Sequence, residues 1–216
     1  MALSDPRALR VYVVTSSAPS GRSHREIARA AIQGGATAIQ LRAPELGDRA
    51  LTSLAADLAR ACREAGVLFL VNDRPGVAAA VGADGAHVGQ SDDPAGARAV
   101  VGPHAVLGIS VASPQEARRA RGFGADYLGV TVWPSATKAD ADPGGLERID
   151  AVVRATDLPV VGIGGIDAGN ASDVLAGGAI GVAVSSAIAE AVDPVAATRE
   201  LAAAVRDALA EPGGPR

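Results

Sequence analysis

The chain alternates short runs of β-branched and aliphatic residues with longer runs of helix-favouring residues. The expected strands, each followed by a helical segment, are residues 11–15, 37–42, 67–72, 85–89, 105–110, 125–132, 158–164 and 179–185. The clearest expected helices are residues 23–33, 48–65, 113–121 and 167–176. Successive strands begin roughly 20–30 residues apart, which is the spacing of one strand–helix unit. This repeat predicts buried parallel strands that are each covered by a helix.

Eight such units predict an α/β fold, a single (β/α)8 TIM barrel spanning residues 1–210, with a disordered tail at 211–216. An open doubly wound sheet is the alternative, and it usually carries a glycine-rich fingerprint after its first strand. Here residues 16–22 read SSAPSGR, which does not fit that fingerprint. Aromatic residues make up only 2% of the chain, so its apolar residues are mainly Ala, Val, Leu and Ile, which fits short buried parallel strands flanked by helices. The 26 glycines imply many tight strand–helix turns.

Charge and cysteine content limit the partners. A net charge of −4 argues against nucleic acid as a partner, because a phosphate backbone requires a basic surface. No apolar run reaches transmembrane length and no signal-peptide pattern is present, so we expect a cytoplasmic protein with no membrane partner. The single cysteine, Cys62, excludes an intrachain disulfide and a cysteine metal cluster, and its helical context predicts a core residue. Many barrels of this kind form homo-oligomers, but the sequence does not indicate the oligomeric state.

The last two expected strands run into turns that suit a phosphate group. In this fold the functional groups gather at the carboxyl ends of the strands. The segments GIGGI (162–166) and AVSSAI (183–188) place Gly165, Ser185 and Ser186 just before helical segments. Backbone N–H groups at such turns bind phosphate, and glycine lets the anion approach closely. Turns chosen for geometry alone are the alternative, but two matched turns favour the phosphate site.

Two acidic residues, Asp73 and Asp92, follow the third and fourth expected strands. Adjacent parallel strands lie about 4.8 Å apart, so both carboxylates can share one Mg²⁺ together with substrate phosphate oxygens. Helix capping is the alternative role. It is weakened for Asp92, because Asp93 followed by Pro94 already makes a good N-cap, and it stays open for Asp73.

Two basic residues, Arg42 and Lys138, follow the second and sixth expected strands. Either residue alone is explained as a solvated surface charge. Beside an acidic pair, they fit a site that binds a diphosphate and stabilises the charge of a departing pyrophosphate.

The histidines and the tryptophan carry weaker signals. His87 lies inside the fourth expected strand, where a hydrogen-bonded core histidine is the favoured role, while His24 and His104 are predicted to be exposed. Trp133 is predicted to be a packing residue. No arrangement of residues suggests a protein nucleophile.

Taken in order, these motifs resemble the thiamine phosphate synthase family. The matching stretches are VYVVT (11–15), GGATAIQLR (34–42), VNDRPGVAAAVGADGAHVGQSD (71–92), LGIS (107–110), GADYLGV (124–130), WPSATK (133–138), VVGIGGI (160–166) and GVAVSSAI (181–188). They cover nearly the whole chain. The central block at 71–92 is long and specific, whereas most other phosphate-binding barrels share only the last two motifs.

The resemblance implies a Mg²⁺-dependent transferase of thiamine biosynthesis. Such an enzyme couples 4-amino-5-hydroxymethyl-2-methylpyrimidine diphosphate to 4-methyl-5-(2-phosphoethyl)thiazole, giving thiamine phosphate and pyrophosphate. Family chemistry is dissociative: pyrophosphate leaves, a pyrimidinylmethyl cation forms, and the thiazole nitrogen attacks that cation.

The resemblance also assigns roles to residues. Asp73 and Asp92 would hold Mg²⁺, and the catalytic residues would be Arg42, Ser110 and Lys138. The implied substrate-binding residues are Gln40, Arg42, Asn72 and Lys138 for the diphosphate, Ser110 for the pyrimidine, Ser135 and Thr137 for the thiazole ring, and Gly165, Ser185 and Ser186 for the thiazole phosphate.

The chain departs from the family pattern near the diphosphate. The family usually reads QLR-acid-Lys after the second strand, whereas Pro44 stands here in place of the lysine. The run before Lys138 is one residue shorter, lacks a Gly-Pro pair and has Ser135 in place of a threonine. The first strand ends in Thr-Ser instead of Thr-Asp. Arg22 and Arg74 are the candidates to replace the lost lysine charge.

Two other functions fit parts of this pattern. One is a thiazole tautomerase from the sister branch of the family, which needs no metal and for which His87 is the candidate base. The other is a non-catalytic paralogue that binds a phosphorylated ligand, for which Pro44 and the shortened run argue. The retained acidic pair favours the synthase.

Overall fold

The computed structural model describes residues 3–17, 20–89, 92–134 and 144–210. Within these ranges eight parallel strands close into a barrel in chain order, with β1 paired to β8. The strands are β1 (Val11–Val14), β2 (Ala38–Leu41), β3 (Leu68–Asn72), β4 (Gly85–Val88), β5 (Val106–Ser110), β6 (Tyr127–Thr131), β7 (Val160–Ile163) and β8 (Gly181–Val184). The predicted (β/α)8 barrel is confirmed, and each strand lies inside its predicted range.

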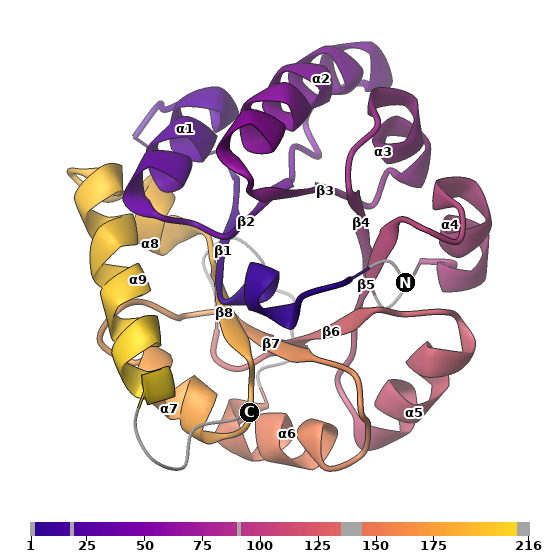
Figure 1. Cartoon of the computed structure of the whole chain (residues 1–216), viewed down its shortest axis with the longest axis vertical. Coiled ribbons are helices and arrows are strands. Elements are labelled where there is room, and N and C mark those ends of the chain that lie inside the picture. The colour runs from indigo at the N-terminus through magenta and orange to yellow at the C-terminus, as the bar shows by residue number, and fades with distance from the viewer. Residues whose placement is uncertain (1–2, 18–19, 90–91, 135–143, 211–216) are drawn as a thin grey trace.

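The helices form a ring around the barrel (Figure 1). They are α1 (His24–Gly34), α2 (Asp48–Ala65), α3 (Pro75–Val81), α4 (Pro94–Val101), α5 (Pro114–Gly122), α6 (Gly145–Val153), α7 (Ala171–Ala176), α8 (Ser186–Ala189) and α9 (Pro194–Ala210). A 3-10 helix, η1 (Pro6–Leu9), precedes β1 and lies across the centre of the barrel in this view.

Side-chain caps explain several helix starts. Ser23 forms a capping box with Glu26 at α1, and Ser113 and Asp93 cap α5 and α4. The predicted helix at 167–176 begins only at Ala171. Its first four residues instead form a turn, in which the Asn170 side chain bonds to the N–H of Asp167 and the carbonyl of Gly165.

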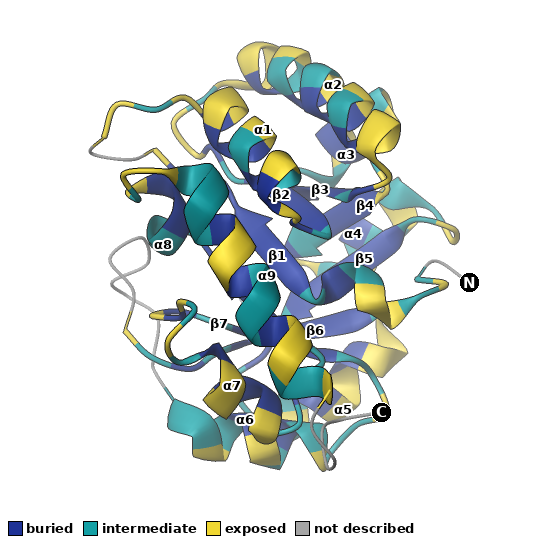
Figure 2. Ribbon diagram, turned by 60° about the vertical axis from the view of Figure 1, so that its left-hand side comes forward, coloured by how far each residue is buried: buried dark blue, intermediate teal, exposed yellow. Residues whose placement is uncertain are grey.

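The core has one layer inside the barrel and another between the barrel and its helices. Alternate residues of β1 divide between them: Tyr12 and Val14 pack inside the barrel, whereas Val11 and Val13 pack against helices. Figure 2 shows the resulting pattern, with buried strands and helices whose outer faces are exposed. The inner layer fills the lower barrel, so the site must form above it, at the carboxyl ends of the strands.

Cys62 is fully buried on α2 among the helix-facing core residues, as predicted. Burial raises the pKa of its thiol to about 12. Among the described residues, no helix is both long enough and apolar enough to cross a membrane.

Candidate active site at the carboxyl ends of the strands

A cavity opens at the carboxyl ends of the strands. Seven of the predicted site residues line it, namely Gln40, Arg42, Asn72, Ser110, Gly165, Ser185 and Ser186. Three others, Ser135, Thr137 and Lys138, lie outside the described residues. The structure therefore brings together residues from β2, β3, β5, β7 and β8 that are far apart in the sequence.

The carboxyl groups of Asp73 and Asp92 lie beside this cavity, close enough to each other to interact. Burial raises the pKa of Asp73, and the Asp92 carboxyl raises it further, while the Asn72 amide and Arg42 lower it. The Asn72 amide donates to Asp73 Oδ2 at 2.6 Å, and the Gly89 N–H donates to Asp92 Oδ2 at 2.6 Å. The two acids thus form a pair that gains from a shared cation or proton.

Neither acid caps a helix. Arg74 occupies the N-cap position of α3 without a side-chain cap bond, and Asp93 caps α4 through the N–H of Gly96. Asp73 also has φ +55°, the one positive value among the described non-glycine residues. A backbone of this kind costs about 1–3 kcal/mol and is concentrated at functional sites. The capping role that stayed open for Asp73 is therefore wrong, and a binding role remains.

Arg42 lies close enough to Asp73 to lower the pKa of that carboxyl. In the described ranges no carboxylate forms a salt bridge with Arg42. Arg22 instead donates to the carbonyls of Ala189 and Val192, and Arg74 pairs with Asp48 at 2.5 Å. Neither candidate for replacing the family lysine is therefore directed at the acidic pair.

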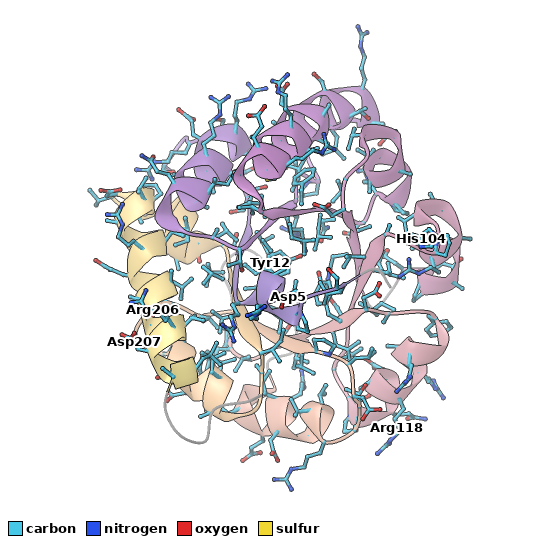
Figure 3. The ribbon with its side chains drawn as sticks, viewed as in Figure 1. Asp5, Tyr12, His104, Arg118, Arg206 and Asp207 are labelled. Atoms are coloured by element: carbon cyan, nitrogen blue, oxygen red, sulfur yellow. The ribbon has the colours of Figure 1, made fainter. Side chains whose placement is uncertain are left out.

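His24 is buried, with 8% of its surface exposed, so the prediction that it is exposed is wrong. Its Nδ1 lies 2.9 Å from Thr15 Oγ1, and its Nε2 lies 2.7 Å from Glu45 Oε1. Thr15 Oγ1 in turn accepts a hydrogen bond from the backbone N–H of Arg42. His24 therefore helps to hold the end of β2 that carries Arg42. His104, by contrast, lies on the outside of the barrel, as predicted (Figure 3).

The opposite end of the cavity is built from backbone and hydroxyl groups. Gly164 and Gly165 have φ values of +94° and +62°. A Cβ at Gly164 would lie 2.6 Å from the Trp133 carbonyl oxygen, and one at Gly165 would lie 2.9 Å from Trp133 Cβ. Ser185 Oγ donates to Ser16 Oγ at 2.9 Å, which ties the end of β8 to the end of β1. Glycine is thus required here both for backbone conformation and for space.

The floor of the cavity includes two tyrosines that sequence reasoning missed. Tyr12 and Tyr127 point into the barrel, and their hydroxyl oxygens lie 2.9 Å apart. His87 bonds to Tyr127 and to Ser110, and it also lines the cavity. The predicted hydrogen-bonded role of His87 is confirmed. A polar residue inside an otherwise apolar strand is the signal that could have identified both tyrosines.

Comparisons with known proteins agree with this geometry. The family model described as thiamine monophosphate synthase matches residues 11–188. The chain belongs to the thiamine monophosphate synthase family. It is 48% identical over 192 residues to a thiamine-phosphate synthase of Moorella thermoacetica, covering 88% of this chain and 91% of that protein.

Two further relatives extend this likeness. A thiamine-phosphate synthase of Haloquadratum walsbyi is 46% identical, with 94% of each chain covered. The solved structure of a thiamine phosphate pyrophosphorylase from Pyrococcus furiosus superposes with a TM-score of 0.87 at 38% identity, covering 94% of this chain and 98% of that one. Likeness to this family thus extends over nearly the full barrel and both ends of the cavity.

The acidic pair fits the divalent cation that the synthase family implies. Mg²⁺ is commonly held by one or two carboxylates, with substrate phosphates and water supplying the other oxygens. No group of three or more His, Cys, Asp or Glu residues able to hold a metal occurs in the described ranges, so a cation at Asp73 and Asp92 would depend on such additional ligands. The raised pKa of Asp73 marks a pair whose repulsion a cation would relieve.

Proposed function

We propose that this chain is a thiamine-phosphate synthase that joins a pyrimidine diphosphate to a thiazole phosphate and releases pyrophosphate. The observation that carries the proposal is one cavity with Arg42 and Asn72 at one end, where the acidic pair lies beside it, and a glycine–serine turn at the other end. Two anionic groups of different character can therefore occupy it at once. Relatives that are 48% and 46% identical to this chain are named thiamine-phosphate synthase.

In this proposal Asp73 and Asp92 hold Mg²⁺ through their carboxylate oxygens. Their contact with each other and with Asn72 supports a shared cation at this position. The bound cation supplies positive charge against the diphosphate oxygens.

The diphosphate is bound from the β2 and β3 side by Gln40, Arg42 and Asn72. Lys138, which lies outside the described residues, is the further cation that we assign to it. Arg42 is well suited to this task, because it lies near Asp73 and no described carboxylate pairs with it. As pyrophosphate departs, Arg42 and Lys138 stabilise the charge that develops on the bridging oxygen. Ser110 orients the pyrimidine ring from β5.

The thiazole phosphate binds at the opposite end, between Gly165 and the Ser185–Ser186 turn. Neutral N–H and hydroxyl donors suit a phosphate that does not react. We assign binding of the thiazole ring to Ser135 and Thr137, which lie outside the described residues. The cavity also has an apolar wall, to which Val161, Ile163 and Ile166 contribute.

The chemistry balances without a protein nucleophile. The C–O bond between the pyrimidine methylene and the diphosphate breaks, and both bonding electrons leave with pyrophosphate. The thiazole nitrogen lone pair then forms the new C–N bond to the methylene carbon. The apolar wall supports this route, because water would otherwise capture the carbocation.

The test is a coupling assay with both substrates and Mg²⁺, in which thiamine phosphate and pyrophosphate are quantified by chromatography. We expect both products in equal amounts, and their loss on chelation of the metal. The proposal fails if no product forms while Asp73→Ala leaves Mg²⁺-dependent diphosphate binding unchanged. Proton exchange on a thiazole carboxylate phosphate without Mg²⁺ would instead indicate the tautomerase.

The proposed function also fits the cytoplasmic location expected from the sequence. A buried, unpaired Cys62 is compatible with the reducing cytoplasm. The partners are then the two small-molecule substrates, without nucleic acid or membrane, and a homo-oligomer is the assembly to test by light scattering.

A further inference from the structure

A chain of hydrogen bonds crosses the floor of the cavity through five side chains. Gln40 Nε2 donates to the Tyr12 hydroxyl at 2.5 Å, and the Tyr12 and Tyr127 hydroxyls lie 2.9 Å apart. Tyr127 Oη lies 2.8 Å from His87 Nδ1, and His87 Nε2 lies 2.9 Å from Ser110 Oγ. We call this set of residues the relay. It links β2, β1, β6, β4 and β5, with Tyr12 near the barrel centre (Figure 3).

Glycines on β5 and β6 make the relay possible. Gly108 lies between His87 and Tyr127 in the strand register, and a Cβ there would lie 2.2 Å from Tyr127 Cζ and 2.4 Å from His87 Nδ1. A Cβ at Gly129 would lie 3.1 Å from His87 Cε1. Glycine inside a strand weakens it and often marks close approach of other groups. Both strands therefore leave room for the His87–Tyr127 contact.

The direction of the hydrogens follows from the Gln40 end. An amide nitrogen only donates, so the single hydrogen of Tyr12 must go to Tyr127. Tyr127 then accepts from Tyr12, and its own hydrogen goes to His87 Nδ1. His87 consequently carries its hydrogen on Nε2 and donates it to Ser110.

Burial enforces this order. Tyr12 and Tyr127 expose 2% and 0% of their surfaces, and burial raises the pKa of both hydroxyls, so each keeps its proton. No buried side-chain polar atom in the described part of the chain lacks a hydrogen-bond partner. Reversing one link would leave a buried hydroxyl hydrogen directed at another donor, which is costly.

We infer that the relay fixes the His87 ring with its hydrogen on Nε2 and so makes the Ser110 hydroxyl a hydrogen-bond donor toward the cavity. Tyr127 and His87 are then positioning residues that act through Ser110. The ligand atom that faces Ser110 must be an acceptor, such as an unprotonated ring nitrogen or a phosphate oxygen. The identity of this ligand rests on the proposed function, but the direction of the relay does not.

The first experiment reads the ring directly by NMR of protein labelled with ¹⁵N-histidine. The chain has three histidines, and His87→Gln identifies the His87 signals by their loss, or His24→Asn and His104→Gln do so by elimination. We expect the hydrogen on Nε2 and an unprotonated Nδ1. A hydrogen on Nδ1 in the unmodified protein would overturn the inference.

Two tyrosine variants form a matched pair for the same spectrum. Tyr127→Phe removes the donor to Nδ1, so we expect the His87 signals to shift toward a mixture of the two ring forms. Tyr12→Phe removes the hydroxyl that sets the direction of the Tyr127 hydrogen but leaves the Tyr127–His87 contact in place, so we expect a smaller shift toward the same mixture. Identical His87 signals in Tyr127→Phe and the unmodified protein would show that the relay does not fix the ring.

The second experiment asks which ligand atom Ser110 meets. Calorimetry compares Ser110→Ala with the unmodified protein for two probes, 4-amino-5-hydroxymethyl-2-methylpyrimidine and pyrophosphate with Mg²⁺. We expect about tenfold weaker binding of one probe, which identifies the acceptor as a ring nitrogen or a phosphate oxygen. Unchanged binding of both would overturn the donor role of Ser110. The NMR result stands or falls separately from the coupling assay, so failure of one is distinguishable from failure of the other.

Discussion

The two ends of the cavity offer different kinds of groups for binding anions. At the end formed after β2, β3 and β4 the groups are ionisable side chains, and Asp92 and Arg42 both shift the pKa of Asp73. At the end formed after β7 and β8 they are backbone and hydroxyl groups around Gly165 and Ser185. The first end also contains Asp73, the one non-glycine residue with positive φ in the described ranges, whereas the positive φ values of the second end fall on glycines.

This difference matches what each end has to do in the proposed reaction. A phosphate that stays unchanged needs fixed dipoles, which cost little when the site is empty. A diphosphate that leaves gains charge, which calls for cations, and the carboxylates that bind a cation repel each other until it arrives. The acidic end therefore lowers the stability of the free protein in exchange for function, and the neutral end does not.

The largest effect is expected at Asp73. Asn tolerates positive φ, so Asp73→Asn keeps the backbone and removes one charge. We expect kcat/KM of the coupling reaction to fall roughly 10²–10³-fold, because the charge of the leaving group loses its stabilisation. Binding of the thiazole phosphate should not change. Without Mg²⁺ the melting temperature should rise, because the repulsion from Asp92 is gone.

Asp93→Asn is the matched control for that variant. It removes a charge from the same loop as Asp92, and Asn keeps the cap on α4. Activity within about twofold of the unmodified protein is expected. Equal losses in the two variants would show that net charge matters here and that the Asp73–Asp92 contact does not.

The next effect is expected at the neutral end, at Gly165. Gly165→Ala places a Cβ at φ +62° and 2.9 Å from Trp133 Cβ, so the turn must move. We expect KM for the thiazole phosphate to rise at least about tenfold with a smaller change in kcat, because the lost groups bind the substrate and its transition state alike. Gly122→Ala, which has open space on α5, is the control. A fall in kcat alone would contradict the assignment of this end to the unreacting phosphate.

A gain of about tenfold in kcat/KM is expected from Pro44→Lys, which restores the family lysine at the acidic end. Arg22 and Arg74 are bonded elsewhere, so a new cation would not compete with them. Pro44→Gln is the control, because it removes the proline ring without adding a positive charge. If both variants have the activity of the unmodified protein, Arg42 and Lys138 already suffice at this end.

The residues that meet at the strand ends could be predicted from the sequence. The alternation of strands and helices gives the order of the strands, and in a (β/α)8 barrel the carboxyl ends of all strands face the same side. Asp73 follows β3 and Asp92 follows β4, so their meeting required only the order of the strands. The Gly165 turn was predictable for a similar reason, since local sequence decides a tight turn. The helix that follows this turn, α7, begins at Ala171 and not at residue 167 as predicted, because the Asn170 side chain bonds to the Gly165 carbonyl. The periodic pattern of apolar residues does not report such a side-chain bond.

Contacts that depend on three or more strands could not be predicted. His24 is polar and begins a helix, so it resembled a surface residue, and its bonds to Thr15 and Glu45 form only when the ends of β1 and β2 come together. Tyr12 and Tyr127 are 115 residues apart, and their meeting depends on register across the whole barrel. The Gly108 gap that admits His87 is likewise visible only once the strands are aligned.

The smallest effect is expected beside the acidic end, at the bond between Glu45 and His24. Burial raises the pKa of Glu45, but hydrogen bonds from His24, its own backbone and Ser17 outweigh burial and leave it below the ordinary 4.5. A carboxyl with a lowered pKa stabilises the fold above its unfolded pKa, and that contribution is lost as pH falls through the folded pKa. Its side chain is 44% exposed, so solvent screening keeps the effect small.

Glu45→Gln should therefore lower the melting temperature slightly at pH 7, and the difference from the unmodified protein should shrink as pH falls below about 4. Glu64→Gln, on the exposed side of α2, is the control and should show no such difference. A difference in melting temperature that persists at low pH would mean that Glu45 acts through packing and not through charge. Because Thr15 bonds to both His24 and the Arg42 N–H, a matching small loss in diphosphate affinity would extend the acidic end beyond the residues that touch the cavity.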